Sequence, residues 1–131
     1  MPLLKESHAV AVARAHAEAW SRHDWDKARR SLSADVKITA TTTQPIMPPT
    51  SLTGVDNYMR GLKEFARPVE PGSLRVIESL GDERNALLMV SVKAAYGPGP
   101  KVTLTQGRLY LIDENDRIKV EQVIFFAVPD Y

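Results

Sequence analysis

The second half of the chain constrains the fold most, because long alternating segments follow one another there with only short turns between them. Residues 85–96 read NALLMVSVKAAY, residues 101–112 read KVTLTQGRLYLI and residues 117–128 read RIKVEQVIFFAV. The connecting segments GPGP and DEND are typical turn sequences, and residues 73–80 form a further strand before them. Adjacent strands joined by short turns form an antiparallel meander.

Two helices are expected near the N-terminus. Ser7 is suited to cap a helix over residues 8–22, and Asp24 is suited to cap a shorter helix over residues 25–33. Apolar and polar side chains of the first helix fall on opposite sides at helical spacing. Both helices are therefore predicted to pack one face against the sheet.

A strand, a long loop and a third helix follow. Residues 36–40 alternate between apolar and polar side chains, and residues 41–53 are rich in Thr and Pro, which is unsuited to a regular central strand. We expect a long, partly extended loop, which is either a functional cover or a plain crossover. The third helix is expected to begin at Thr53 or Asp56 and to end before Pro68, which disfavours helix at the preceding residue. Helices followed by a meander predict an α+β fold.

Composition excludes several classes of protein and site. The chain has 131 residues, and we expect a single domain over residues 1–131. Seventeen basic residues balance 16 acidic ones, so neither a nucleic-acid partner nor a membrane partner is expected. There is no cysteine, and neither a metal nor a cofactor motif is present, so we predict no metal site and no cofactor. The N-terminal MPLLKESHAV lacks the apolar segment of a signal peptide, which predicts a cytoplasmic protein.

One residue of the first helix is unusual for its position. His16 lies between Val12 and Trp20 on the apolar side, among small alanines. An imidazole on a buried face needs a hydrogen-bond partner. His16 is therefore either a structural residue with satisfied hydrogen bonds or a residue that faces a cavity, and the pattern leaves both open.

Three segments resemble a known family. They are AWSRHDWDKARRSLSADVKI, LTGVDNYMRGLKEF and DENDRIKVEQVIFF, and the resemblance spans about residues 8–128. The chain resembles the nuclear transport factor 2-like superfamily, in its SnoaL-like and ketosteroid-isomerase-like branch, with His23-Asp24 where Gly-Asp is usual. The resemblance implies a cone-shaped α+β barrel, in which three N-terminal helices pack on a strongly bent, mainly antiparallel sheet around an apolar pocket.

The resemblance also places two residues. His16 aligns with the tyrosine that ketosteroid isomerases direct into their pocket, so His16 is expected to face it. Ala40 aligns with the catalytic aspartate base of those isomerases, and alanine cannot remove a proton. The ketosteroid isomerase reaction is therefore not expected of this chain.

Strand alternation supplies the remaining candidates. Gln106, Arg108 and Tyr110 share one face of their strand, and Glu121 and Phe125 share a face of the last strand. In the register that the resemblance implies, both faces look inward. We predict His16, Arg108 and Glu121 as catalytic residues. The predicted substrate-binding residues are Trp20, Tyr58, Met59, Leu62, Val90, Val92, Tyr110 and Phe125.

Two functions remain open on these residues. Histidine exchanges protons near neutral pH, and a carboxylate beside an arginine stays ionised. The set predicts a cofactor-independent isomerase, cyclase or hydrolase acting on a hydrophobic cyclic substrate, provided that His16 and Glu121 reach one solvent-connected cavity. Limonene epoxide hydrolase, a relative by fold, surrounds its water with two carboxylates and an arginine, and only Glu121 is evident here. Alternatively, the Arg–Glu pair is a satisfied structural network, and the protein is a non-catalytic ligand-binding or dimerisation module.

Two partners are expected. The first is a small apolar organic ligand in the pocket. The second is another copy of the chain, because residues 123–128 are consecutively apolar, which predicts that both faces of the last strand are buried. We therefore predict a homodimer through the outer face of the sheet.

Overall fold

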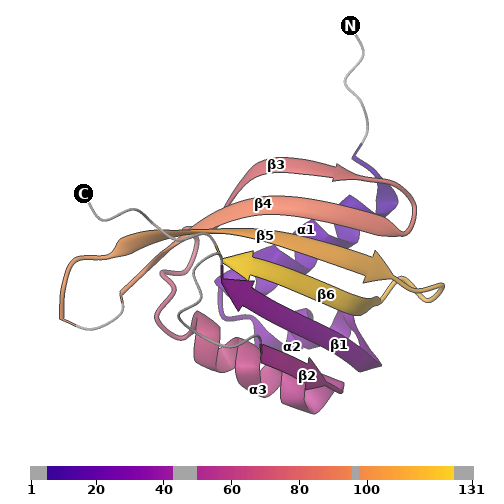
Figure 1. Ribbon diagram of the computed structural model, residues 1–131, viewed down its shortest axis with the longest axis horizontal. Coiled ribbons are helices and arrows are strands. Elements are labelled where there is room, and N and C mark those ends of the chain that lie inside the picture. Colours follow the sequence, from indigo (N-terminus) through magenta and orange to yellow (C-terminus); the bar gives the residue numbers. More distant parts are fainter. Residues whose placement is uncertain (1–5, 43–49, 96–97, 126–131) are drawn as a thin grey trace, which may run out of the picture.

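Figure 1 shows the computed structural model of the chain, which describes residues 6–42, 50–95 and 98–125. The described helices are α1 (His8–Ser21), α2 (Trp25–Arg30) and α3 (Val55–Ala66). The described strands are β1 (Leu32–Thr42), β2 (Thr50–Thr53), β3 (Arg75–Gly81), β4 (Asn85–Ala94), β5 (Val102–Ile112) and β6 (Ile118–Phe125). The element order confirms the predicted α+β fold.

The strands form one bent, open sheet in the order β2-β1-β6-β5-β4-β3. Strands β3 to β6 pair with their neighbours in sequence and are antiparallel, which confirms the predicted meander. β1 instead lies parallel to β6, and β2 pairs antiparallel with β1. All three described helices lie on the same side of the sheet (Figure 1). The sheet therefore has an inner face towards the helices and an outer face away from them.

Small residues let α1 approach the sheet closely. Ala9, Ala13 and Ala17 are completely buried on the face of α1 that packs against β4, and Trp20 fills the space at the end of this row. Ser7 caps the helix, because its hydroxyl accepts a hydrogen bond from the Val10 amide. The predicted amphipathic helix is confirmed.

The turn between α1 and α2 accommodates His23 at the position where the resemblance leads one to expect glycine. His23 has φ of 64°, a left-handed conformation that glycine adopts at lower cost. Its ring stacks on Trp25 and lies 2.9 Å from the Ala66 carbonyl oxygen. Asp24 then caps α2 by accepting a hydrogen bond from the Lys27 amide. Histidine thus occupies a glycine position with contacts of its own.

Two element boundaries differ clearly from the predictions. The second helix ends at Arg30 rather than at residue 33, because Leu32 already pairs with Ile118 as the first residue of β1. The predicted long loop is partly strand, since residues 50–53 form β2 against β1. The prolines that argue against a strand end at Pro49, so residues 50–53 are free to pair with β1. Residues 43–49, the remainder of that loop, lie outside the described residues.

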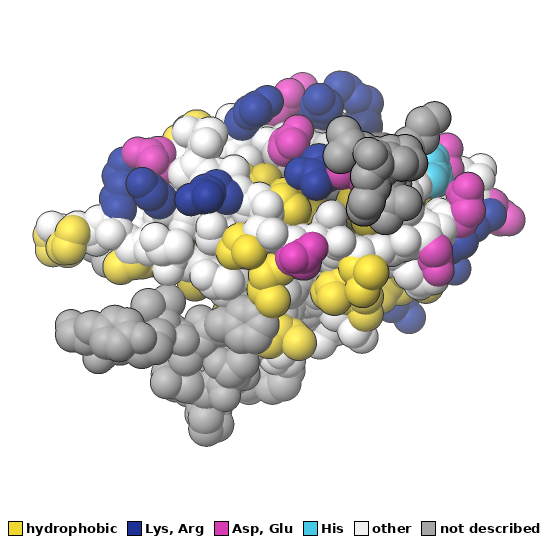
Figure 2. Space-filling model, turned by 90° about the horizontal axis from the view of Figure 1, so that it is seen from above, with side chains coloured by type: hydrophobic (Ala, Val, Ile, Leu, Met, Phe, Trp, Pro, Cys, Tyr) yellow, Lys and Arg dark blue, Asp and Glu magenta, His cyan; other side chains and the backbone are white. Residues whose placement is uncertain are grey.

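The outer face of the sheet carries a row of leucines. Leu80, Leu87 and Leu109 are paired side by side across β3, β4 and β5, and they are 70%, 43% and 45% exposed. Seen from the β3 side, hydrophobic side chains gather on one side of the molecule and most Lys and Arg side chains on the other (Figure 2). On β6, Val123 is buried and Ile124 is 45% exposed, while residues 126–128 lie outside the described part.

Candidate functional site

A pocket of about 500 Å³ lies between α3 and the inner sides of β2, β1, β6 and β5. Its wall is largely apolar, formed chiefly by Ile38, Leu52, Leu62, Phe65, Val123 and Phe125. Tyr58 and Arg108 are the buried polar residues among those that line it, and Glu64 lines it as an exposed residue. Such a concave apolar site with a few polar groups is typical of small-molecule binding.

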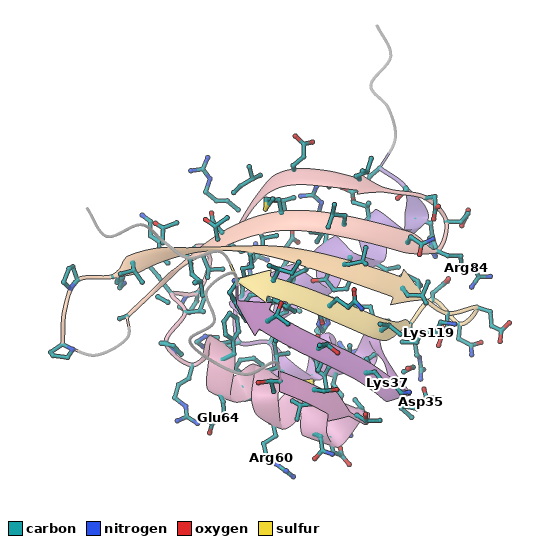
Figure 3. All side chains as sticks on the ribbon, in the orientation of Figure 1. Asp35, Lys37, Arg60, Glu64, Arg84 and Lys119 are labelled. Carbon is teal, nitrogen blue, oxygen red and sulfur yellow. The ribbon has the colours of Figure 1, made fainter. Side chains whose placement is uncertain are left out.

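The pocket lies away from the main charged end of the sheet. Figure 3 shows Lys37 and Lys119 near the end where β1 and β6 begin, and Glu64 towards the opposite end. Ala40, late in β1, and Phe125, last in β6, both line the pocket at this opposite end. Ala40 presents only a methyl group to the pocket and supplies no base there.

A buried chain of hydrogen bonds runs behind the pocket wall. His16 Nδ1 lies 3.0 Å from the Ala28 carbonyl oxygen, and His16 Nε2 lies 2.9 Å from the Tyr58 hydroxyl oxygen. Tyr58 donates to Glu121 Oε1. Arg108 Nη1 donates to Glu121 Oε2 at 2.5 Å. The chain joins α1, α3, β5 and β6, which are contributed by distant parts of the sequence.

Arg108 is held by contacts on several sides. Its Nε donates to Gln106 Oε1 at 2.6 Å, and its guanidinium carbon lies 4.7 Å from the Trp20 ring centroid and 5.5 Å from that of Phe65. Cation–π contact and the carboxylate of Glu121 together compensate for the loss of hydration. Among the described residues, Arg108 Nη2 has no hydrogen-bond partner, so both of its N–H groups remain for a ligand.

Burial and mutual charge govern protonation in the chain. Burial is the main influence on His16 and lowers its pKa. The charge of Glu121 acts to raise this pKa and that of Arg108 acts to lower it, and the net result is a decrease. Burial and the Glu121 charge together raise the pKa of Tyr58 well above its ordinary value. Burial acts to lower the pKa of Arg108, but Glu121 and the two neighbouring tyrosines outweigh it and raise the pKa. Tyr58 and Arg108 therefore stay protonated at neutral pH.

Tyr110 lies beside this chain without joining it. Tyr110 lies directly opposite Glu121 in the pairing of β5 with β6. Burial, and to a smaller extent the charge of Glu121, raise the pKa of Tyr110 well above its ordinary value. Its hydroxyl makes no hydrogen bond of good geometry with a described residue, although Glu121 and Arg108 lie close enough to act on its pKa, and Trp20 Nε1 and Gln106 Nε2 also lack partners among these residues. Tyr110 is therefore a buried phenol close to the chain but outside its line of hydrogen bonds.

The structure places the predicted residues in two groups. Tyr58, Leu62, Arg108 and Phe125 line the pocket. The others are buried around it and are not among its lining residues: His16, Trp20, Met59, Val90, Val92, Tyr110 and Glu121. His16 and Glu121, both 0% exposed, are thus brought together through Tyr58 rather than in the pocket itself, so the expected shared solvent-connected cavity is not found among the described residues.

Within the described residues, no three His, Asp or Glu side chains gather closely enough to bind a metal ion. Over the same part of the chain, none of the helices is long and apolar enough to cross a membrane.

Comparison with known proteins defines the family. The SnoaL-like domain model matches residues 13–122. The chain belongs to the SnoaL-like family. The same comparison made against curated proteins gave no match.

Solved structures share the fold of this SnoaL-like chain at low sequence identity. A protein from Kribbella flavida DSM 17836 is 23% identical, with a TM-score of 0.75, covering 92% of this chain and 88% of its own. A proposed SnoaL-like polyketide cyclase from Shewanella putrefaciens CN-32 is 12% identical, with a TM-score of 0.76 and coverages of 92% and 81%. An LEH-like epoxide hydrolase from M. tuberculosis is 17% identical, with a TM-score of 0.68 and coverages of 90% and 82%. These identities establish the fold alone.

Sequence reasoning missed one feature of the SnoaL-like site. Tyr58 was assigned to the pocket wall, whereas its hydroxyl also links His16 to Glu121. The helical stripe that contains Tyr58 indicated burial but not which side of the stripe meets α1. One signal for this link was present in the sequence. His16 and Tyr58 were both expected to be buried, on separate helices, and each then needs a polar partner, which the other could supply.

Proposed function

We propose that this SnoaL-like protein binds an apolar cyclic small molecule in the pocket and exchanges protons with it, without a cofactor. The observation that carries the proposal is that Tyr58 and Arg108 each belong to two features of the structure. Both line the apolar pocket, and both belong to the buried hydrogen-bond chain that contains His16 and Glu121. The pocket wall thus joins an apolar binding surface to groups that can hold and move a proton.

Each residue has a distinct role in this proposal. Tyr58 is the residue through which a proton passes between substrate and chain, since His16 and Glu121 are fully buried behind it. His16 and Glu121 are positioning residues that hold the hydroxyl and share its proton. Arg108 stabilises negative charge that develops on a substrate oxygen, because a preorganised cation in an apolar site acts strongly on such charge.

The pocket favours some reactions over others. Ala40 on the wall supplies no carboxylate base, so proton abstraction by the ketosteroid isomerase route is not proposed. Donation of a proton to an oxygen beside Arg108 fits ring opening, hydration and cyclisation, in which an oxygen gains charge. Isomerisation remains within the proposal as a relay, in which the Tyr58 oxygen takes a proton from the substrate while its own proton passes to Glu121.

A second candidate function rests on the same chain. A polar partner lies within hydrogen-bond distance of both nitrogens of His16 and of both carboxylate oxygens of Glu121. Such a network can hold the helices on the sheet without any chemistry. In that case the protein is a ligand-binding module with the same pocket.

We also propose that the protein forms a homodimer through the outer face of its sheet. The row formed by Leu80, Leu87 and Leu109 runs across three strands and is substantially exposed. An apolar face of this kind is stabilised when a second copy covers it, and a self-complementary contact closes as a symmetric dimer.

Comparison of two tyrosine variants tests the enzyme proposal. Small cyclic ketones, lactones and epoxides are incubated with the wild-type protein, Tyr58→Phe and Tyr110→Phe. Solvent deuterium incorporation and product formation are then measured by NMR. Tyr110→Phe is the matched control, because it removes a buried hydroxyl that has no described partner and lies off the pocket wall. Turnover lost only in Tyr58→Phe supports the enzyme. Binding without turnover in the wild-type protein supports the module instead.

A further inference from the structure

The hydrogen-bond chain behind the pocket is one proton short of completion. The Ala28 carbonyl can only accept, so His16 Nδ1 must carry a hydrogen to bond with it. The Tyr58 hydroxyl has a single hydrogen, yet its oxygen lies within bonding distance of both His16 Nε2 and Glu121 Oε1. Both contacts become hydrogen bonds only if His16 or Glu121 carries one additional proton.

Neither residue holds that proton easily by itself. Complete burial disfavours the charged form of His16, and Arg108 adds a second positive charge nearby. Glu121 Oε2 accepts a hydrogen bond from Arg108 Nη1 at 2.5 Å, and a proton placed on Glu121 would remove the counterion of that buried cation. The completed chain with Arg108 would carry a net charge of +1 in the core, whichever residue is protonated. A further negative charge close to Arg108 would remove this obstacle.

The charged and titratable groups around the chain leave one place for such a charge. From α1 comes His16, from α3 Tyr58, from β5 Arg108 and Tyr110, and from β6 Glu121, while α2 contributes only the Ala28 carbonyl. Glu64 lines the pocket but is exposed, and it lies 3.6 Å from Arg67. Arg108 Nη2 has no described partner, and Arg108 lines the pocket. Because Arg108 lines the pocket and keeps unused N–H donors, an anion in the pocket can pair with this buried cation.

We propose that the ligand of this pocket is an apolar organic anion, a carboxylate or a similar oxyanion, whose binding to Arg108 is coupled to uptake of one proton by the His16–Tyr58–Glu121 chain. The inference rests on the proposed function, since it names the class of molecule that the same pocket takes. Two anions beside one guanidinium repel each other, and one proton relieves the repulsion. The bound proton then completes the hydrogen bonds of Tyr58.

A pH dependence of definite sign follows. Because binding takes up a proton, an anionic ligand binds more tightly as pH falls through the range in which the free protein lacks that proton. The affinity changes by at most about tenfold per pH unit for one proton. A neutral ligand of the same shape brings no charge to Arg108, so its affinity is expected to be independent of pH in that range.

Isothermal titration calorimetry with matched pairs of probes tests the inference. The pairs are benzoate and benzamide, naphthoate and naphthamide, and decanoate and decanamide, titrated in phosphate and in Tris at the same pH. We expect at least one carboxylate to bind about tenfold or more tightly than its amide. Its binding enthalpy should differ between the buffers by the amount that uptake of one proton requires.

Two variants keep the outcome interpretable. Tyr58→Phe breaks the chain, so proton uptake should disappear, whereas Tyr110→Phe should retain it. Thermal unfolding establishes that both variants are folded. Equal affinity for carboxylate and amide, or carboxylate binding without proton uptake, overturns this inference and leaves the apolar pocket standing. Failure of every probe to bind overturns the proposed function and this inference with it.

Discussion

The pair formed by Arg108 and Glu121 gives the sharpest stability prediction. Their side chains are 2% and 0% exposed, and Arg108 Nη1 lies 2.5 Å from Glu121 Oε2. Removing one partner leaves the other charge buried without its counterion, which costs about 3–5 kcal/mol. We therefore expect Glu121→Gln and Arg108→Met each to lower the free energy of unfolding by about that amount. The arginine variant also loses the contact with the Trp20 ring, worth about 1 kcal/mol.

The double variant distinguishes charge pairing from simple loss of packing. With both charges removed, no ion remains buried, so the double variant should be no less stable than the worse single variant. The coupling energy is then about 3 kcal/mol or more. The free energy of unfolding of the wild type, the two single variants and the double variant is measured by urea denaturation. Unfolding is followed by far-ultraviolet circular dichroism, because this signal does not depend on the environment of Trp20.

An exposed pair supplies the matched control. Arg29 Nη2 lies 2.5 Å from Asp56 Oδ1, and these side chains are 49% and 79% exposed. The same cycle with Arg29→Met and Asp56→Asn should show a coupling below about 1 kcal/mol. A coupling at Arg108 and Glu121 as small as that of the exposed pair would refute the argument that burial makes their pairing essential.

Three further outcomes are expected. Because burial lowers the pKa of His16 below its ordinary 6.5, the unfolded chain binds more protons below that value, so the free energy of unfolding should fall as pH drops from 7 towards 5. Urea titrations at several pH values should show a flatter profile for His16→Gln. A Cβ at Gly81 would lie 2.4 Å from the Asn85 carbonyl oxygen, so Gly81→Ala should lower the unfolding free energy by about 1–3 kcal/mol in the same denaturation assay. Leu109→Arg should convert a dimer to a monomer by light scattering, whereas Ala11→Arg on the exposed side of α1 should leave the mass unchanged.

Local patterns in the chain determined most of the elements. Side chains that alternate between apolar and polar, with short turns between the segments, predicted β3 to β6. This works because each strand buries one face and because tight turns favour Gly, Pro, Asn and Asp. Capping residues predicted the starts of α1 and α2 for the same local reason. The prediction for β2 was wrong because its pairing with β1 is a tertiary contact, and TSLT has no strong pattern of its own.

The candidate site depended on contacts that no local pattern contains. The sequence by itself determined that His16 lies on an apolar helix face, whereas the inward direction of Arg108 and Glu121 was implied by the family resemblance and not by alternation along either strand. Only the tertiary structure decided that Tyr58 stands between His16 and Glu121, and that the pocket is reached by Tyr58 and Arg108 alone among these four. Periodicity specifies which face of an element is buried, whereas the partner on the other side is set by how distant elements pack.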